Sequence, residues 1–421
     1  MAKANSFQTP IGTRDVQPPE SARWQALIDA FASEASLANY GLLHTPIFED
    51  LGVFQRIGEG TEVVKKEMYD FLDKGDRRMV LRPENTASVC RAFVQHRPIV
   101  PWKVWYQGPF FRYEAPQAGR QRQFNQLGIE VLGSSDADVD VEVIALGSRF
   151  LEAIGLRRVL LLINSMGDAE TRIAYADAVQ KYLRDNIGDI DPEDHDKVEA
   201  HPLRVLDSKR EATRRVTSEA PRIESFLSVE AGLHFERVQA GLGSLGIPFA
   251  IEPRLVRGLD YYTHTLFEYQ SSALETAQNA LGGGGRYNGL VEELGGPDTP
   301  GIGFAMGIER LLLACDAEQT FSPPSTSPVV WIIDVTDGSA ARDLSHELRA
   351  AGIATDRSFD HRSMRSQMKA ADRSGAGWAL IIGDQELATG VVTLRNLRSD
   401  VAQQTLARSE VVSAVAEVLS R

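Results

Sequence analysis

The sequence is poor in cysteine and lacks any long apolar run. Its 421 residues include only two cysteines, Cys90 and Cys315, which lie far apart. That count excludes a cysteine zinc site and suits a reducing cytoplasm. The longest apolar runs are far too short to span a bilayer, and the N-terminus lacks the apolar segment of a secretory signal. We therefore expect a cytoplasmic protein that does not enter a membrane.

The chain also lacks an excess of basic residues and the common signatures of catalysis. Its net charge of −13 argues against bulk electrostatic capture of nucleic acid, although local basic patches are compatible with it. The eight histidines show no metal-ligand spacing, and no nucleophile triad or HExxH pattern stands out. The run GGGGRYNG at 282–289 fits neither a dinucleotide fingerprint nor a P-loop, so it indicates close backbone packing.

The length of the chain suits two or three domains. Residues 1–322 mix strand and helix patterns, and within them a polar, helical stretch at about 170–245 predicts an insertion. Residues 323–328 belong to a linker rich in proline and serine. Beyond it, at 329–421, strand and helix patterns alternate, which predicts a small α/β domain with a mixed sheet.

Residues 104–132 read as a strand, a basic loop and a second strand. In the second strand Leu127, Ile129 and Val131 point one way, whereas Phe124, Gln126, Gly128 and Glu130 point the other. An ordinary solvated sheet face would explain the polar side. Two features favour a ligand floor instead: the arginines of the loop, and Gly128, whose missing side chain would let a ligand approach.

Local signals place three further elements. Apolar spacing predicts a helix over 20–40 with Gly41 as its C-cap, and DKGD at 73–76 predicts a hairpin turn. Pro83 predicts a helix start with Glu84 in its first turn and Thr86 beside it. Taken alone, Glu84 is explained more simply as a carboxylate that favours the helix dipole.

Four arginines in glycine- or turn-rich surroundings are candidates for binding phosphate or carboxylate: Arg112, Arg120, Arg257 and Arg310. A surface salt bridge is the commoner role for any single arginine. Tyr261, Tyr262 and Tyr287 are by the same standard more often core aromatics than ligand contacts.

Taken together, these stretches resemble class II aminoacyl-tRNA synthetases, and among them the bacterial histidyl-tRNA synthetase family. The resemblance is collinear over the whole chain and rests on these runs: GTRD (12–15), KEMYDF (66–71), LRPENTA (81–87), FRYEAPQAGRQRQFNQLGIEVLG (111–133), HPLRVLDSK (201–209), LVRGLDYYTHTLFE (255–268), GGGRYNGL (283–290) and PGIGFAMGIERLL (300–312). It implies an α+β catalytic domain with an antiparallel sheet and a helical insertion. It also implies a C-terminal α/β anticodon-binding domain.

The resemblance implies the activity of a histidine–tRNA ligase. Such an enzyme condenses L-histidine with ATP, accompanied by Mg²⁺, to histidyl-adenylate and diphosphate, and then transfers histidine to tRNA(His). The family works as a homodimer whose interface is expected within 40–70. A histidine-sensing regulatory subunit of ATP phosphoribosyltransferase is the alternative, but such proteins usually lack the C-terminal domain. A generic RNA-binding module is disfavoured because the residues expected for ATP and histidine are all there.

The resemblance also assigns roles to single residues. Arg112 and Arg257 would bracket the α-phosphate and the histidine carboxylate as the catalytic cations, and Arg120 and Arg310 would hold the other phosphates. Adenine would lie between Phe124 and Arg310, with Glu114 near its amino group. The remaining residues would surround histidine: Glu84, Thr86 and Gln126 at the α-amino group, Glu130 and Tyr262 at the imidazole, and Tyr261 and Tyr287 around the pocket.

Three positions depart from the family pattern: Asn85, where glycine is common, Ala115, where arginine is expected, and Asn125, where histidine is expected. None of them is assigned to the chemical step. In the C-terminal domain Arg362, Arg365, Lys369 and Arg373 recur at three- and four-residue spacing, which predicts a basic face on one helix. The default interpretation is a solvated face, and the resemblance favours contact with the RNA backbone.

Overall fold

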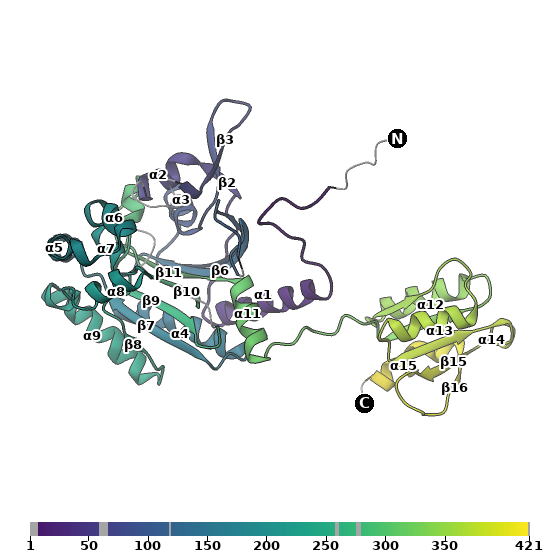
Figure 1. Ribbon diagram of the computed structural model, residues 1–421. Coiled ribbons are helices and arrows are strands. Elements are labelled where there is room, and N and C mark those ends of the chain that lie inside the picture. The colour runs from purple at the N-terminus through teal and green to yellow at the C-terminus, as the bar shows by residue number, and fades with distance from the viewer. Residues whose placement is uncertain (1–6, 59–65, 118, 257–260, 275–278, 420–421) are drawn as a thin grey trace. The chain divides into compact units, whose positions relative to one another are not determined.

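The computed structural model describes residues 7–58, 66–117, 119–256, 261–274 and 279–419. Its contacts divide the chain into two units, residues 1–323 and residues 324–421, and each is described separately. Figure 1 follows the chain from the first unit to the second. Among the described residues, no helix is both long and apolar enough to cross a membrane.

The first unit is built on a sheet of eight strands in the order β1-β5-β6-β11-β10-β9-β7-β8. Their bounds are β1 (Gly41–Leu42), β5 (Trp102–Phe111), β6 (Gln123–Leu132), β7 (Val159–Ser165), β8 (Ala250–Ile251), β9 (Thr263–Ser271), β10 (Ala280–Arg286) and β11 (Gly301–Gly307). The inner strands pair antiparallel, and the two short edge strands, β1 and β8, pair parallel with β5 and β7. The expected antiparallel sheet is therefore confirmed.

Helices cover both faces of this sheet, and a small second sheet lies beside it. The helices are α1 (Glu20–Leu37), α2 (Leu51–Gly58), α3 (Thr86–His96), α4 (Ala137–Ala153), α10 (Leu290–Glu293) and α11 (Ile308–Glu318). The small antiparallel sheet has the order β2-β4-β3, with β2 (Phe48–Asp50), β3 (Tyr69–Leu72) and β4 (Arg78–Leu81). The turn predicted at 73–76 joins β3 to β4, because the Asp73 carboxylate accepts hydrogen bonds from the Gly75 and Arg77 backbone amides.

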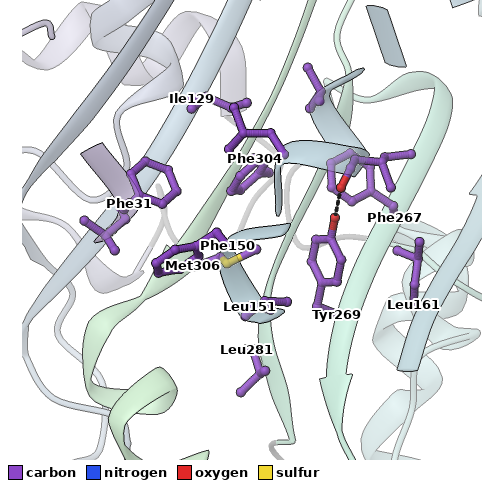
Figure 2. Packing of buried hydrophobic residues seen from close by; sticks show 14 of the residues in the cluster. Phe31, Ile129, Phe150, Leu151, Leu161, Phe267, Tyr269, Leu281, Phe304 and Met306 are labelled. Atoms are coloured by element: carbon purple, nitrogen blue, oxygen red, sulfur yellow. Dashed lines mark hydrogen bonds between the residues drawn. The ribbon is translucent and has the colours of Figure 1, made fainter. Parts of the chain in front are cut away.

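The main core lies on the face of the sheet that α1, α4 and α11 cover. Phe31 of α1 makes edge contacts with Phe150 of α4 and Phe304 of β11, at centroid distances of 5.0 and 6.2 Å. Ile129 of β6 belongs to the same cluster (Figure 2). A second cluster, which contains Tyr106, Tyr261 and Tyr287, packs on the opposite face with α2, α3 and α10.

The alternation predicted for β6 is confirmed, whereas the interpretation of its polar face as a solvated face is wrong. Leu127, Ile129 and Val131 enter the main core, and Phe124 and Leu132 pack with the second cluster. The strand is buried on both faces from Leu127 to Leu132 because helices lie on each side of the sheet.

The first helix ends earlier than its spacing predicts. It stops at Leu37, and Gly41 begins β1 instead of capping the helix. Asn39 takes the left-handed backbone conformation, with φ 62°, and the Tyr40 amide donates to the Ala35 carbonyl at 2.9 Å. Asn39 therefore closes the helix in the way that glycine often does, because asparagine also tolerates positive φ.

The segment from 169 to 244 is helical, as its composition predicts. Its helices are α5 (Ala169–Asp185), α6 (His195–Ala200), α7 (Pro202–Val205), α8 (Glu211–Thr217) and α9 (Val229–Ser244). Helices α5 to α8 pack in a separate core with Leu162 of β7 and Leu266 of β9, whereas α9 joins the main core beside α4. The segment therefore contacts the sheet through both cores.

The second unit has a five-stranded mixed sheet in the order β13-β12-β14-β15-β16. Strands β12, β13 and β14 run parallel, and β15 and β16 continue antiparallel. The bounds are β12 (Val330–Asp334), α12 (Ser339–Ala350), β13 (Thr355–Arg357), α13 (Met364–Arg373), β14 (Trp378–Ile382), α14 (Asp384–Thr389), β15 (Val391–Asn396), β16 (Gln404–Ala407) and α15 (Val411–Leu419). The predicted α/β unit is confirmed, with β16 and α14 as additions that the sequence pattern did not indicate.

We expect Phe304→Ala to lower the free energy of unfolding of the first unit by about 3–5 kcal/mol, because it leaves a cavity between packed aromatic rings. Urea unfolding followed by tryptophan fluorescence measures the change. Phe48→Ala is the matched control: its side chain is mostly exposed, so a change within about 0.5 kcal/mol is expected. Equal losses in the two variants would contradict the packing described for Phe304.

Candidate active site

A pocket of about 240 Å³ opens where the β5–β6 loop meets β6, β9, β10, β11 and α11. Its lining includes six of the residues predicted for ATP or histidine: Arg112, Glu114, Arg120, Phe124, Gln126 and Arg310. It also includes Glu268 and Glu309, two carboxylates that the sequence did not single out. Residues separated by nearly two hundred positions therefore converge on one cavity.

Two arginines of the pocket are oriented by backbone carbonyls. The Arg112 Nε donates to the Pro83 carbonyl at 3.0 Å, and its guanidinium carbon lies 5.3 Å from the centre of the Phe124 ring. Arg310 donates to the carbonyls of Gly119 and Ala280 at 3.2 and 2.9 Å. Burial lowers the pKa of Arg310, and the neighbouring charge of Arg120 adds to the effect. Fixed cations of this kind are suited to phosphate oxygens.

The third arginine, Arg120, lies on the exposed side of the pocket. Its Nε is 2.5 Å from an oxygen of Glu114, so these two predicted ATP residues form an ion pair. Arg120 therefore forms a salt bridge, which is the common role of an arginine, and it also lines the pocket.

Glu84 precedes a helix instead of lying in its first turn, because α3 begins at Thr86 and not at Pro83. Its carboxylate accepts from the backbone amides of Thr86 and Ala87 at 2.6 and 2.9 Å. Burial raises the pKa of Glu84, and the two amides oppose that rise. The simpler interpretation, a carboxylate at a helix N-terminus, describes these contacts correctly.

Glu130 is buried on the same face of β6 as Phe124 and Gln126. One of its oxygens accepts from the hydroxyls of Thr86, at 2.8 Å, and Tyr106, at 3.4 Å; the other accepts from Tyr287 at 2.6 Å. Burial raises the pKa of Glu130 to about 8, with Glu84 adding to the rise and the hydroxyls of Tyr287 and Thr86 opposing it. The carboxylate is therefore held in place before any ligand arrives.

The space beside Gly128 holds a side chain of the protein, which corrects the expectation that a ligand approaches there. Tyr106 of β5 pairs with Gly128, and a Cβ on Gly128 would collide with the Tyr106 ring and hydroxyl. Gly303 of β11 likewise leaves room for Glu130, whose carboxylate occupies the space that a Cβ on Gly303 would take. The sequence argument missed Tyr106, although a tyrosine opposite a glycine becomes a signal once the hairpin register is known.

The three predicted tyrosines form one cluster. The ring centroids of Tyr261 and Tyr262 are 4.8 Å apart, and those of Tyr261 and Tyr287 are 5.9 Å apart. Tyr261 and Tyr287 are almost completely buried, as the core interpretation expects. The predicted catalytic residue Arg257 lies outside the described residues.

Of the three departures from the family pattern, Asn85 is buried, Asn125 is half-buried and Ala115 is exposed. The Asn85 side chain accepts from the Thr45 hydroxyl at 2.6 Å, and the Asn125 backbone amide donates to Glu309 at 2.9 Å. Ala115 is exposed beside the pocket loop.

Comparison with known proteins identifies the family of this chain. The sequence model of the family described as Histidyl-tRNA synthetase matches residues 12–311, and the one described as Anticodon binding domain matches residues 329–418. A "Histidine--tRNA ligase" of Synechocystis sp. is 46% identical over 99% of this chain and 94% of its own length. One of Rhodococcus erythropolis is 44% identical over the full length of both chains. The chain belongs to the histidyl-tRNA synthetase family.

Solved structures agree with this family. Apo histidyl-tRNA synthetase of S. aureus is 37% identical, covers 97% of this chain and 100% of its own, and superposes with a TM-score of 0.83. A protein of Bacillus halodurans, described as an ATP phosphoribosyltransferase regulatory subunit/histidyl-tRNA synthetase, has a TM-score of 0.64 at 23% identity, which bears on the fold alone. The fold is that of a class II synthetase with an anticodon-binding domain.

The anticodon-binding unit corrects one detail of the basic helix face. Helix α13 begins at Met364, so Arg362 lies before the helix, with its guanidinium 3.7 Å from Asp360. Arg365, Lys369 and Arg373 follow one another at four-residue spacing on α13, and all three are exposed. The basic face therefore consists of these three residues.

We expect Glu130→Gln to stabilise the protein more at pH 8.5 than at pH 5, relative to the natural chain. Because the folded-state pKa of Glu130 is raised to about 8, this group's stabilising contribution is complete below about pH 4.5 and is lost as the pH rises through 8. Glutamine cannot ionise, so the difference in free energy of unfolding between variant and natural chain should grow by about 4 kcal/mol across this range.

Urea unfolding at the two pH values measures this difference. Glu236→Gln serves as the control, because Glu236 is exposed and its substitution should change stability by no more than about 0.5 kcal/mol. A difference for Glu130→Gln that does not vary with pH would show that its carboxylate does not titrate in the folded state as described.

Proposed function

We propose that the chain is a histidine–tRNA ligase, which activates L-histidine with ATP and then transfers it to the 3′ end of tRNA(His). The observation that carries this proposal is the arrangement of one strand face. On β6, Phe124 and Gln126 line the arginine-rich pocket, and Glu130 lies four residues further along the same face. At about 3.3 Å per residue, roughly 13 Å separates Gln126 from Glu130, so a nucleotide and an amino acid can lie end to end.

The first step joins the histidine carboxylate to the α-phosphate of ATP. The new P–O bond forms as the bond to the bridging oxygen breaks, and diphosphate leaves with the electron pair of that bond. Negative charge accumulates around the phosphorus, so the reaction depends on fixed positive charge more than on a general base. Arg112 is already oriented towards this pocket, and we assign Arg257 to the same role from the resemblance.

For ATP, the geometry suits a nucleotide with adenine against Phe124 and its phosphates among the arginines. Arg112 follows β5 and Arg310 lies on α11, so they reach the cavity from different elements, and the Arg120–Glu114 ion pair also lines it. Mg²⁺ would arrive with the phosphates, since this ion usually takes one or two carboxylates and keeps phosphate and water oxygens. Glu268 fits that role because its carboxylate lines the pocket, where it accepts a hydrogen bond from the Gln270 amide at 2.8 Å.

For histidine, the buried Glu130 offers the polar group that an imidazole requires. In its ionised form Glu130 has about four lone-pair directions, and three are used by hydroxyls, so one remains for an imidazole N–H. Tyr262 would address the other ring nitrogen, and Tyr261 and Tyr287 would complete the surroundings. Gln126, Thr86 and Glu84 would hold the α-amino group. A site with such groups rejects side chains that leave them unpaired.

The proposal also covers partners, location and domain limits. The basic face of α13 would contact the tRNA backbone. The homodimer is carried over from the resemblance, and the cytoplasmic location is inferred from the two isolated cysteines. The domain limits 1–322 and 329–421 and the insertion at about 170–245 belong to the same proposal. The regulatory-subunit alternative is not favoured, because this chain has an anticodon-binding unit as well as the pocket arginines.

We expect the purified protein to exchange diphosphate into ATP only when histidine and Mg²⁺ are present, and to charge tRNA(His). Isotope exchange followed by an aminoacylation assay measures both steps. Each of the other amino acids serves as a control for specificity. If histidine gives no exchange above the level without amino acid, the proposed function is wrong.

We expect the double variant Arg365→Gln, Lys369→Gln to raise the KM for tRNA about tenfold while histidine-dependent exchange stays unchanged. The loss of two phosphate contacts should also reduce the slope of log affinity against log salt by about 1.4–1.8. Charging assays at several salt concentrations measure both effects. Arg408→Gln, which removes a cation paired with Glu347 in the same unit, is the control and should leave tRNA KM within about twofold. An unchanged tRNA KM in the double variant would exclude α13 from the RNA contact.

A further inference from the structure

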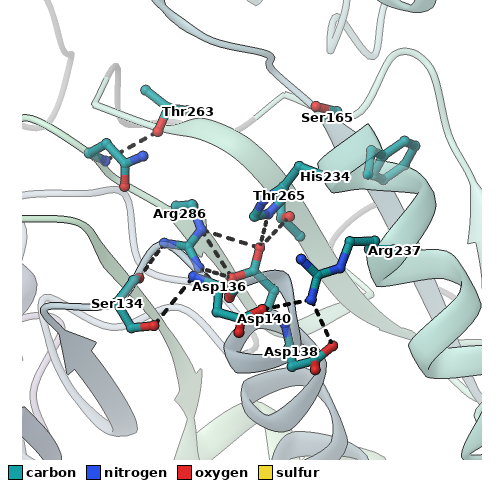
Figure 3. A network of polar contacts seen from close by, with 12 residues as sticks. Ser134, Asp136, Asp138, Asp140, Ser165, His234, Arg237, Thr263, Thr265 and Arg286 are labelled. Carbon is teal, nitrogen blue, oxygen red and sulfur yellow. Dashed lines mark hydrogen bonds and ion pairs between the residues drawn. The ribbon is translucent and has the colours of Figure 1, made fainter. Parts of the chain in front are cut away.

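A buried ion pair joins β10 to α4 directly beside the residues described for histidine. Arg286, the last residue of β10, is fully buried and donates through Nε to an Asp140 oxygen at 3.0 Å and through Nη2 to the same oxygen. The rest of its guanidinium donates to the carbonyls of Ser134 and Asp136 at 2.7 and 3.1 Å (Figure 3). The whole fork of this side chain is therefore engaged.

Asp140 also joins two further elements. Its second oxygen is 2.7 Å from His234 Nε2 on α9 and accepts from the Thr265 hydroxyl on β9 at 2.6 Å (Figure 3). Burial alone would raise the pKa of Asp140, but hydrogen bonds from His234 and Arg286 hold it below its usual value, so the carboxylate stays charged. Three elements thus converge on one carboxylate.

The sheet itself is irregular at this point. The register between β10 and β9 passes from Gly285 opposite Leu266 to Arg286 opposite Thr263, so two residues of β9 bulge out of the ladder. One of them, His264, takes the left-handed backbone conformation, with φ 45°. The ladder with β9 breaks here, whereas the ladder with β11 continues through Arg286 opposite Ile302. On the β9 side, the side-chain bonds of Arg286 hold the end of β10 where the ladder does not.

The next residue after this restrained point is Tyr287, whose hydroxyl donates to Glu130 at 2.6 Å. Its own backbone amide donates to the Gly301 carbonyl at 2.8 Å. A displacement of Arg286 would therefore move the Tyr287 ring and weaken one of the three hydroxyl contacts that orient Glu130.

We propose that Asp140 and Arg286 are positioning residues for histidine recognition, which act through Tyr287 on the Glu130 carboxylate. This inference rests on the proposed ligase function. Neither residue touches substrate; their contribution is to fix the point at which β10 ends, and with it the Tyr287 hydroxyl. If the pair merely stabilised the fold, its removal would lower stability but would affect histidine and ATP binding alike.

The test compares two buried aspartates in exchange assays on the full chain. Asp140→Asn should raise the KM for histidine about five- to tenfold, which is the loss expected for one buried hydrogen bond, and leave the KM for ATP within about twofold. Asp194→Asn is the matched control. Asp194 is also fully buried and bonded to an arginine, Arg210, and to two hydroxyls, yet it belongs to the helical segment 169–244. It should reduce thermal stability and leave both KM values unchanged.

A double variant tests whether Tyr287 is the intermediary. Tyr287→Phe should itself raise histidine KM about five- to tenfold, and adding Asp140→Asn should raise it by less than about twofold more, because both changes remove the same orienting contact. Independent effects that multiply would overturn the proposal, and so would equal changes of the histidine and ATP KM values in Asp140→Asn.

If Asp140→Asn does not fold, Thr265→Val decides the question, because it removes one donor to Asp140 and leaves Arg286 in place. Its histidine KM should rise about threefold, in line with one lost hydrogen bond, and an unchanged value would contradict the proposal. Exchange by the natural chain distinguishes failure of the ligase function from failure of the positioning role. If the natural chain shows no histidine-dependent exchange, the ligase function is refuted. If it exchanges normally but the variants change the KM for histidine and ATP equally, only the positioning role is refuted.

Discussion

The burial of the Glu130 carboxylate is the constraint on which the surrounding structure depends. An ionisable group removed from water costs free energy unless hydrogen bonds replace its solvation. Glu130 lies on a strand that is buried on both faces, and hydroxyls from α3, β5 and the residue after β10 supply those bonds. Because the donors come from separate parts of the chain, the group is oriented only when the whole sheet has formed.

The glycines of the sheet follow from the same constraint. A Cβ on Gly303 would occupy the position of the Glu130 carboxylate, and a Cβ on Gly128 would collide with Tyr106. A Cβ on Gly284 would run into the backbone of Gly303 on the neighbouring strand. The glycine run therefore lets strands and side chains approach closely enough to enclose a polar group, which agrees with the close backbone packing inferred from the sequence.

Sequence reasoning succeeded where periodicity carries the information. The alternation of β6, the helical character of 169–244 and the mixed sheet of the second unit all follow from short-range patterns. It failed where the answer depends on a distant partner. The space at Gly128 is filled by Tyr106 because of the register of β5 with β6, and Arg286 meets Asp140 because two elements 146 residues apart are packed together. Nothing local marks either pair, and the roles of the arginines came from family resemblance.

The two halves of the site also differ in how they are made rigid. The side proposed for ATP is an open pocket in which Arg112 and Arg310 are oriented by backbone carbonyls, which leaves their charge unneutralised by those contacts. The side proposed for histidine is buried around Glu130, which side-chain hydroxyls hold in place. A small uncharged ring gains little from long-range attraction and depends on matched hydrogen bonds, whereas a polyphosphate tolerates some movement of its cations. Under the proposed function, the more rigid support therefore lies on the histidine side, where the Arg286–Asp140 ion pair holds the end of β10.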